Sequence, residues 1–258
     1  MPGELVATLA ILSALAEEQQ GLLACLSQPV CLRRAGREVW RGQWQGKDVL
    51  LALSRIGKVA AATTTTALIE GLGATHVVFT GVAGGIGPGV RVGDLVVATE
   101  FVQHDLDASP LFPRFEIPLY GRSRLACDPA LTALLLRASE SAATRLAGQF
   151  NQISGLARST VHAGLIASGD RFVSGAAELQ GLQQRLLAGG HVPLAVEMEG
   201  AAVAQVCFDY GIPFAAVRTI SDRADDAAHV DFPRFVRDVA SPYAQAIMTA
   251  FLRLLPNQ

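Results

Sequence analysis

The chain has 258 residues, of which 50% are hydrophobic and 17% charged, and its formal net charge is -2. This composition predicts a single large α/β domain over residues 1–258, with enough apolar residues for a substantial core. Because neither sign of charge is clustered, the sequence excludes an electrostatic surface for nucleic acid or for an anionic membrane, and we expect a small-molecule partner.

The N-terminal apolar run and the cysteines indicate the compartment. The run from Leu5 to Leu15 has no basic start and is followed at once by Glu17 and Glu18, which predicts a buried strand, not a signal peptide. No uninterrupted stretch reaches the roughly 20 apolar residues that a membrane helix needs. The four cysteines lack metal-ligand or CxxC spacing: Cys25, Cys31, Cys127 and Cys207. We therefore predict a soluble cytoplasmic protein with reduced thiols and with no metal or cofactor.

Short apolar, β-branched runs alternate with longer helical patterns along most of the chain. This alternation predicts an α/β fold with a largely parallel, buried sheet. The predicted strands are Val6–Leu12, Val39–Gln43, Asp48–Ser54, His76–Thr80, Leu95–His104, Val161–Ser168, Leu194–Met198 and Phe214–Ile220. The clearest predicted helices are Lys58–Leu72, Pro129–Ala143, Ala176–Leu187, Gly200–Asp209 and Arg234–Leu255.

Two segments depart from this alternation. The runs on either side of Trp44–Lys47 predict a hairpin, which would make the sheet mixed. The segment Asp105–Pro118 has three prolines and no hydrophobic period. It predicts a long loop of the kind that forms lids or contact surfaces.

The glycine run Thr80–Gly87 matches the pattern with which short-chain dehydrogenases hold a dinucleotide. Such a loop must open a helix, whereas here Pro88 and a turn lead into another strand. The catalytic tyrosine is also missing, because none stands four residues before Lys47 or Lys58. We therefore exclude a dehydrogenase and predict a turn after a strand, either to bring backbone amides close to a ligand or simply to reverse the chain.

Acidic residues follow three of the predicted strands. Glu197 and Glu199 interrupt an apolar passage, Asp222 follows Ser221 at the end of another, and Glu18 follows the first strand. A buried ionised acid is costly unless it is paired or binds something, and ligands of parallel sheets bind beyond the carboxyl ends of the strands. These acids predict a ligand site, while capping of the following helix by one of the two glutamates remains open.

The acidic segments, the glycine run, Gly57 and Ser168–Phe172 follow one another along the chain as the corresponding motifs do in the purine nucleoside phosphorylase superfamily, which the sequence therefore resembles. Within it, the chain is similar to the methylthioadenosine/S-adenosylhomocysteine nucleosidases from about Leu9 to Leu254. The most specific motifs are Val196-Glu-Met-Glu-Gly200 and Arg218-Thr-Ile-Ser-Asp222. The resemblance implies a three-layer α/β/α domain around a mixed, twisted sheet, a homodimer, and hydrolysis of the N-glycosidic bond between adenine and a 5'-thio-substituted ribose.

Cleavage of that bond builds positive charge on the ribose and negative charge on the purine. A proton donor at N7 of the base relieves the second charge, and Asp222, in apolar surroundings that favour its protonated form, suits this role. The resemblance implies that Glu18 accepts a proton from the attacking water, although composition alone favours a solvated helix-start acid. It also implies that Glu199 binds the ribose hydroxyls and stabilises the cation beside the Met198 backbone.

Further residues are implied to hold the substrate. Arg218 would orient the water or Glu18, and Glu197 would have a supporting or capping role. The base would stack on Phe172, bond to the Val173 backbone and be covered by Phe232. The other lining positions are Leu15, Ile56, Val82, Ala83, Gly84 and Ser221.

Several departures from the family pattern bear on the reaction and on the substrate. A phosphorylase needs arginines ahead of the glycine run and after the first strand, where this chain has Phe79 and Glu18, so hydrolysis is favoured. Arg55, where a glycine is usual, is the one residue that argues the other way. Val82 replaces a serine near the ribose.

The loop from His104 to Gly121 is expected near the partner subunit's pocket in the homodimer. Its Leu111, Phe112 and Phe115 favour a small apolar 5'-group over homocysteine. For His104, we expect a ring satisfied by the neighbouring Asp105 carboxylate and not a catalytic dyad.

Two alternatives remain. The first is another enzyme of the superfamily, a futalosine or aminofutalosine hydrolase or a true phosphorylase. The second is a non-catalytic nucleoside-binding or storage protein, which could lose any of Glu18, Glu199 or Asp222 without penalty, whereas all three are present.

Overall fold

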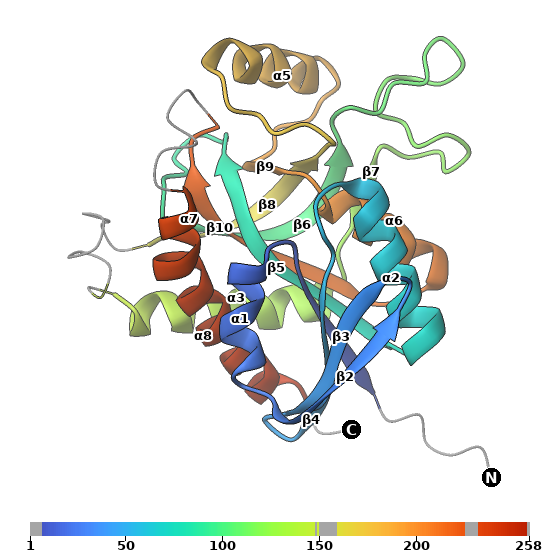
Figure 1. Cartoon of the computed structure of the whole chain (residues 1–258). Helices are drawn as coiled ribbons and strands as arrows, with labels where there is room; N and C mark the ends of the chain where they lie inside the picture. Colours follow the sequence, from blue (N-terminus) through green and yellow to red (C-terminus); the bar gives the residue numbers. More distant parts are fainter. Residues whose placement is uncertain (1–6, 148, 150–158, 225–231, 257–258) are drawn as a thin grey trace.

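A continuous sheet of ten strands organises residues 7–147, 149, 159–224 and 232–256, which are the residues that the computed structural model describes (Figure 1). The strands are β1 (Thr8–Ser13), β2 (Ser27–Arg34), β3 (Arg37–Trp44), β4 (Lys47–Leu53), β5 (His76–Gly85), β6 (Leu95–Gln103), β7 (Arg124–Ala126), β8 (Val161–Ser168), β9 (Ala195–Glu197) and β10 (Phe214–Asp222). Val6, at the start of the first predicted strand, lies outside the described residues.

The helices are α1 (Ala16–Leu23), α2 (Lys58–Leu72), α3 (Pro129–Arg145), α5 (Ala176–Ala188), α6 (Gly200–Tyr210), α7 (Phe232–Phe235) and α8 (Ser241–Leu254). A π-helical turn, η1 (Val236–Ala240), joins α7 to α8, so the single helix predicted from Arg234 to Leu255 is interrupted. Among the residues described, every helix is too short or too polar to span a lipid bilayer.

The sheet is mixed, as predicted. β1 runs parallel to β4 and β5, while β3 and β4 form the predicted antiparallel hairpin, with Trp44 paired to Lys47. β10 pairs with β5 on one side and with β6 on the other, and β6 is joined back to β5 through β8 and β9. These five strands therefore close into a ring, whose strand ends position the side chains described below.

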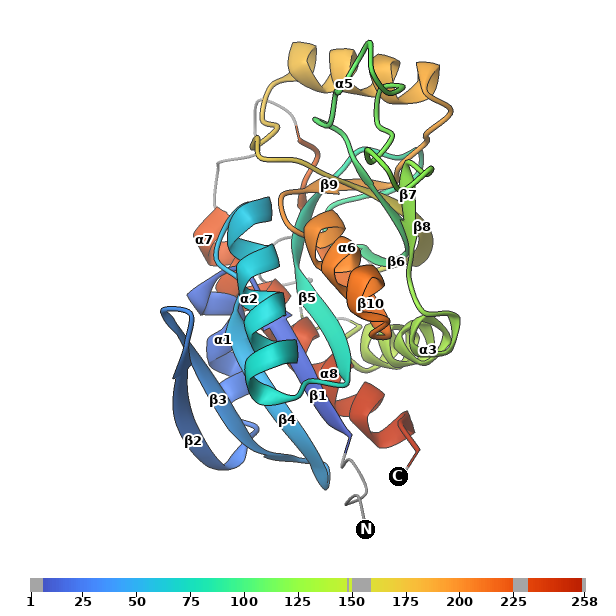
Figure 2. The ribbon, with the colours of Figure 1, turned by 90° about the vertical axis from the view of Figure 1, so that its right-hand side faces the viewer.

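Helices cover both faces of the sheet, which confirms the three-layer expectation. α2 and α6 pack together on one face (Figure 2), and α8 packs between α1 and α3 on the other. Along β1, alternate side chains serve the two layers: Leu12 lies in the apolar cluster that contains Leu68 of α2, and Ile11 lies in the cluster that contains Phe251 of α8. Both faces of this strand are buried, which explains its continuous apolar sequence.

Three elements were not predicted. β2 is an edge strand with mostly exposed residues and a proline at Pro29, so it lacks the alternation that marks a half-buried strand. β7 has three residues, and α1 has a mostly polar sequence with few apolar residues to give a helical period.

The glycine run is the main error in the predicted elements. β5 does not end at Thr80 but continues to Gly85, and Gly84 and Gly85 pair with Val196 and Ala195 of β9. The glycines are thus part of the strand ring, not a turn. Their missing side chains leave room for carboxylates, as the site shows.

Candidate active site

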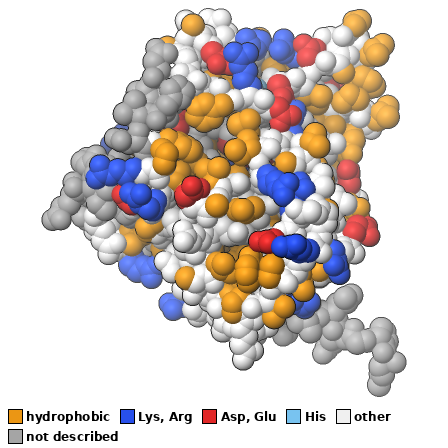
Figure 3. Space-filling view, in the orientation of Figure 1, with side chains coloured by type: hydrophobic (Ala, Val, Ile, Leu, Met, Phe, Trp, Pro, Cys, Tyr) orange, Lys and Arg blue, Asp and Glu red, His pale blue; other side chains and the backbone are white. Residues whose placement is uncertain are grey.

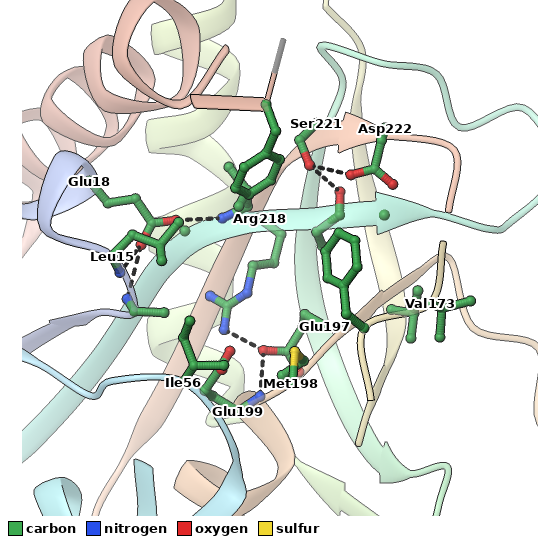
Figure 4. A pocket seen from close by; sticks show the side chains of 18 of the residues that line it. Leu15, Glu18, Ile56, Val173, Glu197, Met198, Glu199, Arg218, Ser221 and Asp222 are labelled. Carbon is green, nitrogen blue, oxygen red and sulfur yellow. Dashed lines mark hydrogen bonds and ion pairs between the residues drawn. The ribbon is translucent and has the colours of Figure 1, made fainter. Parts of the chain in front are cut away.

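One pocket opens where β1, β5, β9 and β10 end (Figure 4). Every residue that was predicted to hold or attack the substrate lines it: Leu15, Glu18, Ile56, Val82, Ala83, Gly84, Phe172, Val173, Glu197, Met198, Glu199, Arg218, Ser221, Asp222 and Phe232. The lining residues that were not predicted are Ala14, Phe79, Gly81, Arg171 and Val196. Segments from Ala14 to Phe232 therefore meet around a single cavity.

Glu18 enters this pocket from the first turn of α1. One carboxylate oxygen accepts the amides of Ala14 and Leu15 at 2.9 and 3.0 Å, and the other accepts the amide of Val82 at 3.0 Å. Gly81 makes this possible, because a Cβ there would stand 3.0 Å from the Glu18 oxygen. Burial raises the pKa of Glu18. The alternative of a solvated helix-start acid is therefore wrong, and the side chain is a desolvated carboxyl held at both oxygens.

Glu197 and Arg218 form a buried ion pair beneath the pocket. Arg218 donates to Glu197 at 2.8 Å and lies 4.0 Å from the centre of the Phe79 ring. Glu197 also accepts the amide of Gly200 at 2.9 Å, so it caps the start of α6, as one of the two glutamates was expected to do. The hydrogen bonds described for Arg218 reach Glu197 and the backbone, and its charge lowers the pKa of Glu18 from a distance.

Glu199 also lines the pocket, and among the described residues it forms no ion pair. One oxygen accepts the amide of Gly57 at 2.8 Å, and only 6% of the residue is exposed. Burial, with the negative charge of Glu197 second, raises the pKa of Glu199 to about 8. A carboxylate in this state gains strongly from a positive charge placed beside it.

Asp222 lies at the opposite end of the pocket from Glu18 (Figure 4). Its two oxygens accept the amide of Ala224 and the hydroxyl of Ser221, both at 2.7 Å. As with Glu18, a glycine makes the room: a Cβ on Gly84 would stand 3.1 Å from an Asp222 oxygen.

Two aromatic residues flank the mouth of the pocket. The rings of Phe172 and Phe232 meet edge to face with their centres 6.4 Å apart, and Phe172 is 47% exposed. A flat apolar group entering the mouth would pass beside these rings.

The expectation for His104 is wrong. The Asp105 carboxylate accepts from Lys58 at 2.6 Å and from the amide of Asp170 at 2.8 Å, and neither bond involves the imidazole. His104 packs against Gly169, and within the described part of the chain its buried Nε2 has no hydrogen-bond partner.

The structure contradicts the expectation for one of the three apolar loop residues, Phe115. Phe115 is buried against His191, with ring centres 5.3 Å apart, so it cannot line the 5'-group pocket. Leu111 is 84% exposed and does not line this chain's own pocket.

Arg55 does not reach the candidate site. It adopts a positive φ of 62°, donates to the carbonyl of Gly36 at 2.8 Å and lines a separate cavity with Arg33 and Arg37. The arginines that line the site are Arg171 and Arg218, and each is paired with a carboxylate, Glu178 and Glu197 respectively. Over the described ranges, no group of three histidine, cysteine or acidic side chains is arranged to hold a metal ion.

Comparisons with known proteins show the family of the chain. The sequence model of the phosphorylase superfamily matches residues 8–253. The 5'-methylthioadenosine/S-adenosylhomocysteine nucleosidase of Shewanella frigidimarina is 35% identical over 226 residues, which are 88% of this chain and 90% of that protein.

Solved structures give the same result. The nucleosidase of that name from Neisseria meningitidis, in complex with methylthio-immucillin-A, is 32% identical and superposes with a TM-score of 0.83 over 96% of this chain and 99% of that chain. The native futalosine hydrolase of Helicobacter pylori is 30% identical, with a TM-score of 0.81 over 97% of this chain and 99% of that chain. The chain therefore belongs to the phosphorylase superfamily.

Proposed function

We propose that the protein is a nucleosidase that hydrolyses the N-glycosidic bond of 5'-methylthioadenosine, releasing adenine and the 5'-thio-substituted ribose. The observation that carries the proposal is the placement of two buried carboxylates, Asp222 and Glu18, at opposite ends of one pocket that Glu199 also lines. An N-glycosidic hydrolase needs a proton donor on the base side and a proton acceptor on the side of the attacking water.

In the proposed reaction, Asp222 gives its proton to N7 of adenine, and the electrons of the breaking bond go to the base. The ribose becomes a cation, which Glu199 stabilises while it holds the hydroxyls. Water then attacks the anomeric carbon and transfers a proton to Glu18. The raised pKa of Glu18 supports this role, because a carboxylate with a higher pKa is a stronger base.

Water is favoured over phosphate as the nucleophile. A phosphate dianion would need unpaired guanidinium groups, but both arginines lining the pocket are paired with carboxylates, and Arg55 lies elsewhere. In their ionised forms, the buried side chains of Glu18 and Glu199 would also repel a dianion.

The rim of the pocket supports a small apolar 5'-substituent. Leu15, Ile56 and Met198 line the site and present aliphatic or thioether surface. A methylthio group needs nothing more, whereas homocysteine adds a charged amine and carboxylate. Methionine salvage in the cytoplasm is the process that this substrate implies.

We further propose that the protein is a homodimer joined through α2, α6 and the loop over residues 105–121. This loop packs on α6, because Tyr120 bonds to Asp209 at 2.8 Å and its ring lies 5.9 Å from that of Phe208. Exposed apolar side chains lie on these elements or just before α2: Ile56, Val59, Leu111, Leu119 and Phe208. Figure 3 shows hydrophobic side chains at its upper right, where the loop over residues 105–121 lies in Figure 1. Because the exposed Ile56 also lines the pocket, an apolar face of this kind supports a partner subunit that completes the rim.

The test is release of free purine by the purified protein from methylthioadenosine, S-adenosylhomocysteine and aminofutalosine, each with and without phosphate. We expect methylthioadenosine to have the largest kcat/KM and phosphate to have no effect. Preference for aminofutalosine would favour the futalosine hydrolase alternative, which the similarity to the Helicobacter pylori enzyme supports. Phosphate-dependent release would show a phosphorylase, and tight binding without release would show a storage protein.

A further inference from the structure

Helix α2 begins without a cap of its own. Its N-cap residue is Gly57, at φ 94°, which has no side chain to accept the first free amides of the helix. Two carboxylates from distant segments accept them instead. Glu199 accepts the amide of Gly57 at 2.8 Å, and Asp170 accepts the amide of Lys58 at 2.7 Å. One of these carboxylates belongs to the proposed reaction, whereas the other lies outside the pocket lining.

Asp170 is itself held in a closed set of contacts, which we call the latch and define as Lys58, Asp105 and Asp170. The Lys58 ammonium donates to Asp105 at 2.6 Å, and the other Asp105 oxygen accepts the amide of Asp170 at 2.8 Å. The Asp170 carboxylate completes the set through the Lys58 amide. Each member thus contacts both others, so Lys58, the first residue of α2, is held through its backbone amide and through its ammonium group.

We propose that Asp170 is a positioning residue for Glu199: the latch holds the Gly57 amide where it hydrogen-bonds the Glu199 carboxylate. The fit at this point is close, since a Cβ on Gly57 would stand 3.1 Å from an Asp170 oxygen. Asp170 reaches no reacting atom and acts only through the neighbouring peptide. The expected loss of activity in an Asp170 variant rests on the nucleosidase function proposed above. The expected change in the pKa of Glu199 does not.

The charges around Glu199 determine the direction of the effect. Burial, Glu197 and Glu18 raise its pKa, whereas the Gly57 amide and Arg218 lower it, and the amide is the larger of these two lowering causes. If the amide loses its position, the pKa of Glu199 rises further. The ionised form, which the ribose cation requires, then exists only at higher pH.

The kinetic test compares three substitutions. Asp170→Ala removes the acceptor of the Lys58 amide, whereas Asp170→Asn keeps an oxygen acceptor. Asp128→Ala is the matched control, because Asp128 caps α3 through the amide of Leu131 at 2.8 Å and does not line the pocket. Both alanine variants lose a helix cap and should melt at similarly lowered temperatures.

Only Asp170→Ala should change catalysis. We expect its kcat/KM at pH 7 to fall about ten-fold, and the acidic limb of its pH profile to move upward by about one unit. Asp170→Asn should stay within about two-fold of the unsubstituted protein. A pH profile for Asp170→Ala that coincides with those of Asp128→Ala and the unsubstituted protein would overturn the proposal.

A second measurement is independent of turnover. Carboxyl carbon NMR of the full-length protein, with the Glu199 signal assigned by its loss in Glu199→Gln, reports the titration of this group directly. We expect an upward shift in Asp170→Ala and none in Asp128→Ala. An unchanged Glu199 titration overturns the positioning role, whereas a protein that releases no adenine but shows the shift overturns only the proposed function.

Discussion

The floor and the rim of the pocket are built on different physical principles. On the floor, Glu18 and Asp222 are buried at the ends of paired strands, and backbone amides hold their oxygens. On the rim, Ile56 is 59% exposed and Phe172 is 47% exposed. The floor thus fixes proton-transfer groups within the fold, whereas the rim offers apolar surface that awaits a substrate or a partner subunit. We infer that chemistry and substrate selection can be changed separately.

The strongest test of this separation is Asp222→Asn. The variant keeps the side-chain shape but cannot protonate the base, so kcat should fall by about 10³-fold. Its melting temperature should stay within a few degrees of that of the unsubstituted protein. The control is Asp48→Asn, which weakens the ion pair with Arg41 on the hairpin and the hydrogen bond from the Thr8 hydroxyl, and Asp48 does not line the pocket. Turnover of Asp222→Asn within ten-fold of the control would show that the floor does not supply the acid.

Glu199→Gln should separate activity from stability. The substitution removes the carboxylate that stabilises the ribose cation, and kcat/KM should fall by about 10²-fold. The same substitution should raise the free energy of unfolding at pH 8 by about 2 kcal/mol, because ionisation of this buried group opposes folding. Denaturant unfolding at pH 5 and pH 8 checks this. If Glu199→Gln instead lowers the free energy of unfolding at pH 8, ionisation of the buried Glu199 does not oppose folding.

The pH dependence of the unsubstituted protein should show two opposite trends. The folded pKa of Glu199 is about 8, above its ordinary value of 4.5, so its contribution to stability is complete below pH 4.5 and is lost as the pH rises through 8. Activity should rise over the same range as the ionised form accumulates. Measured kcat/KM should therefore have an acidic limb with its midpoint nearer 8 than 4.5. A limb near 4.5 would mean that ionisation of Glu199 does not limit the reaction.

The rim should respond more weakly. Leu119→Glu places a charge on a side chain that is 91% exposed, on the proposed dimer face, and should yield a monomer in analytical ultracentrifugation. We expect KM for methylthioadenosine to rise about ten-fold with kcat little changed, because only the rim is incomplete. Leu187→Glu, at an exposed position on α5, is the control. A dimeric Leu119→Glu protein would remove this loop from the proposed interface.

The sequence predicted the floor better than its surroundings. The bounds predicted for α2 and β8 are those observed, since both have strong local patterns. Glu197, Glu199 and Asp222 lie in two short motifs, each of which is local in the chain, whereas Glu18 and the aromatic residues were implied only by the family resemblance. In contrast, the burial of Glu18 depends on the amide of Val82, 64 residues away, and no local pattern reports such a contact.

The errors have the same cause. The local sequence of Thr80–Gly87 predicts a turn. Pairing with β9 and β10 instead makes Gly81, Gly84 and Gly85 part of a strand. The sequence predicts that Asp105 accepts from His104, but the Asp105 carboxylate accepts from Lys58 and from the amide of Asp170 instead. Long-range contacts that decide side-chain partners leave no signature in hydrophobic period or spacing.

Adenine release by the unsubstituted protein and by Glu18→Gln, with methylthioadenosine and with or without phosphate, tests the central claim most directly. We expect release that is independent of phosphate in the unsubstituted protein. In Glu18→Gln we expect substrate binding with turnover lowered by at least about 10²-fold. Release that requires phosphate, or undiminished hydrolysis by Glu18→Gln, would contradict the claim that a buried carboxylate on the floor activates water.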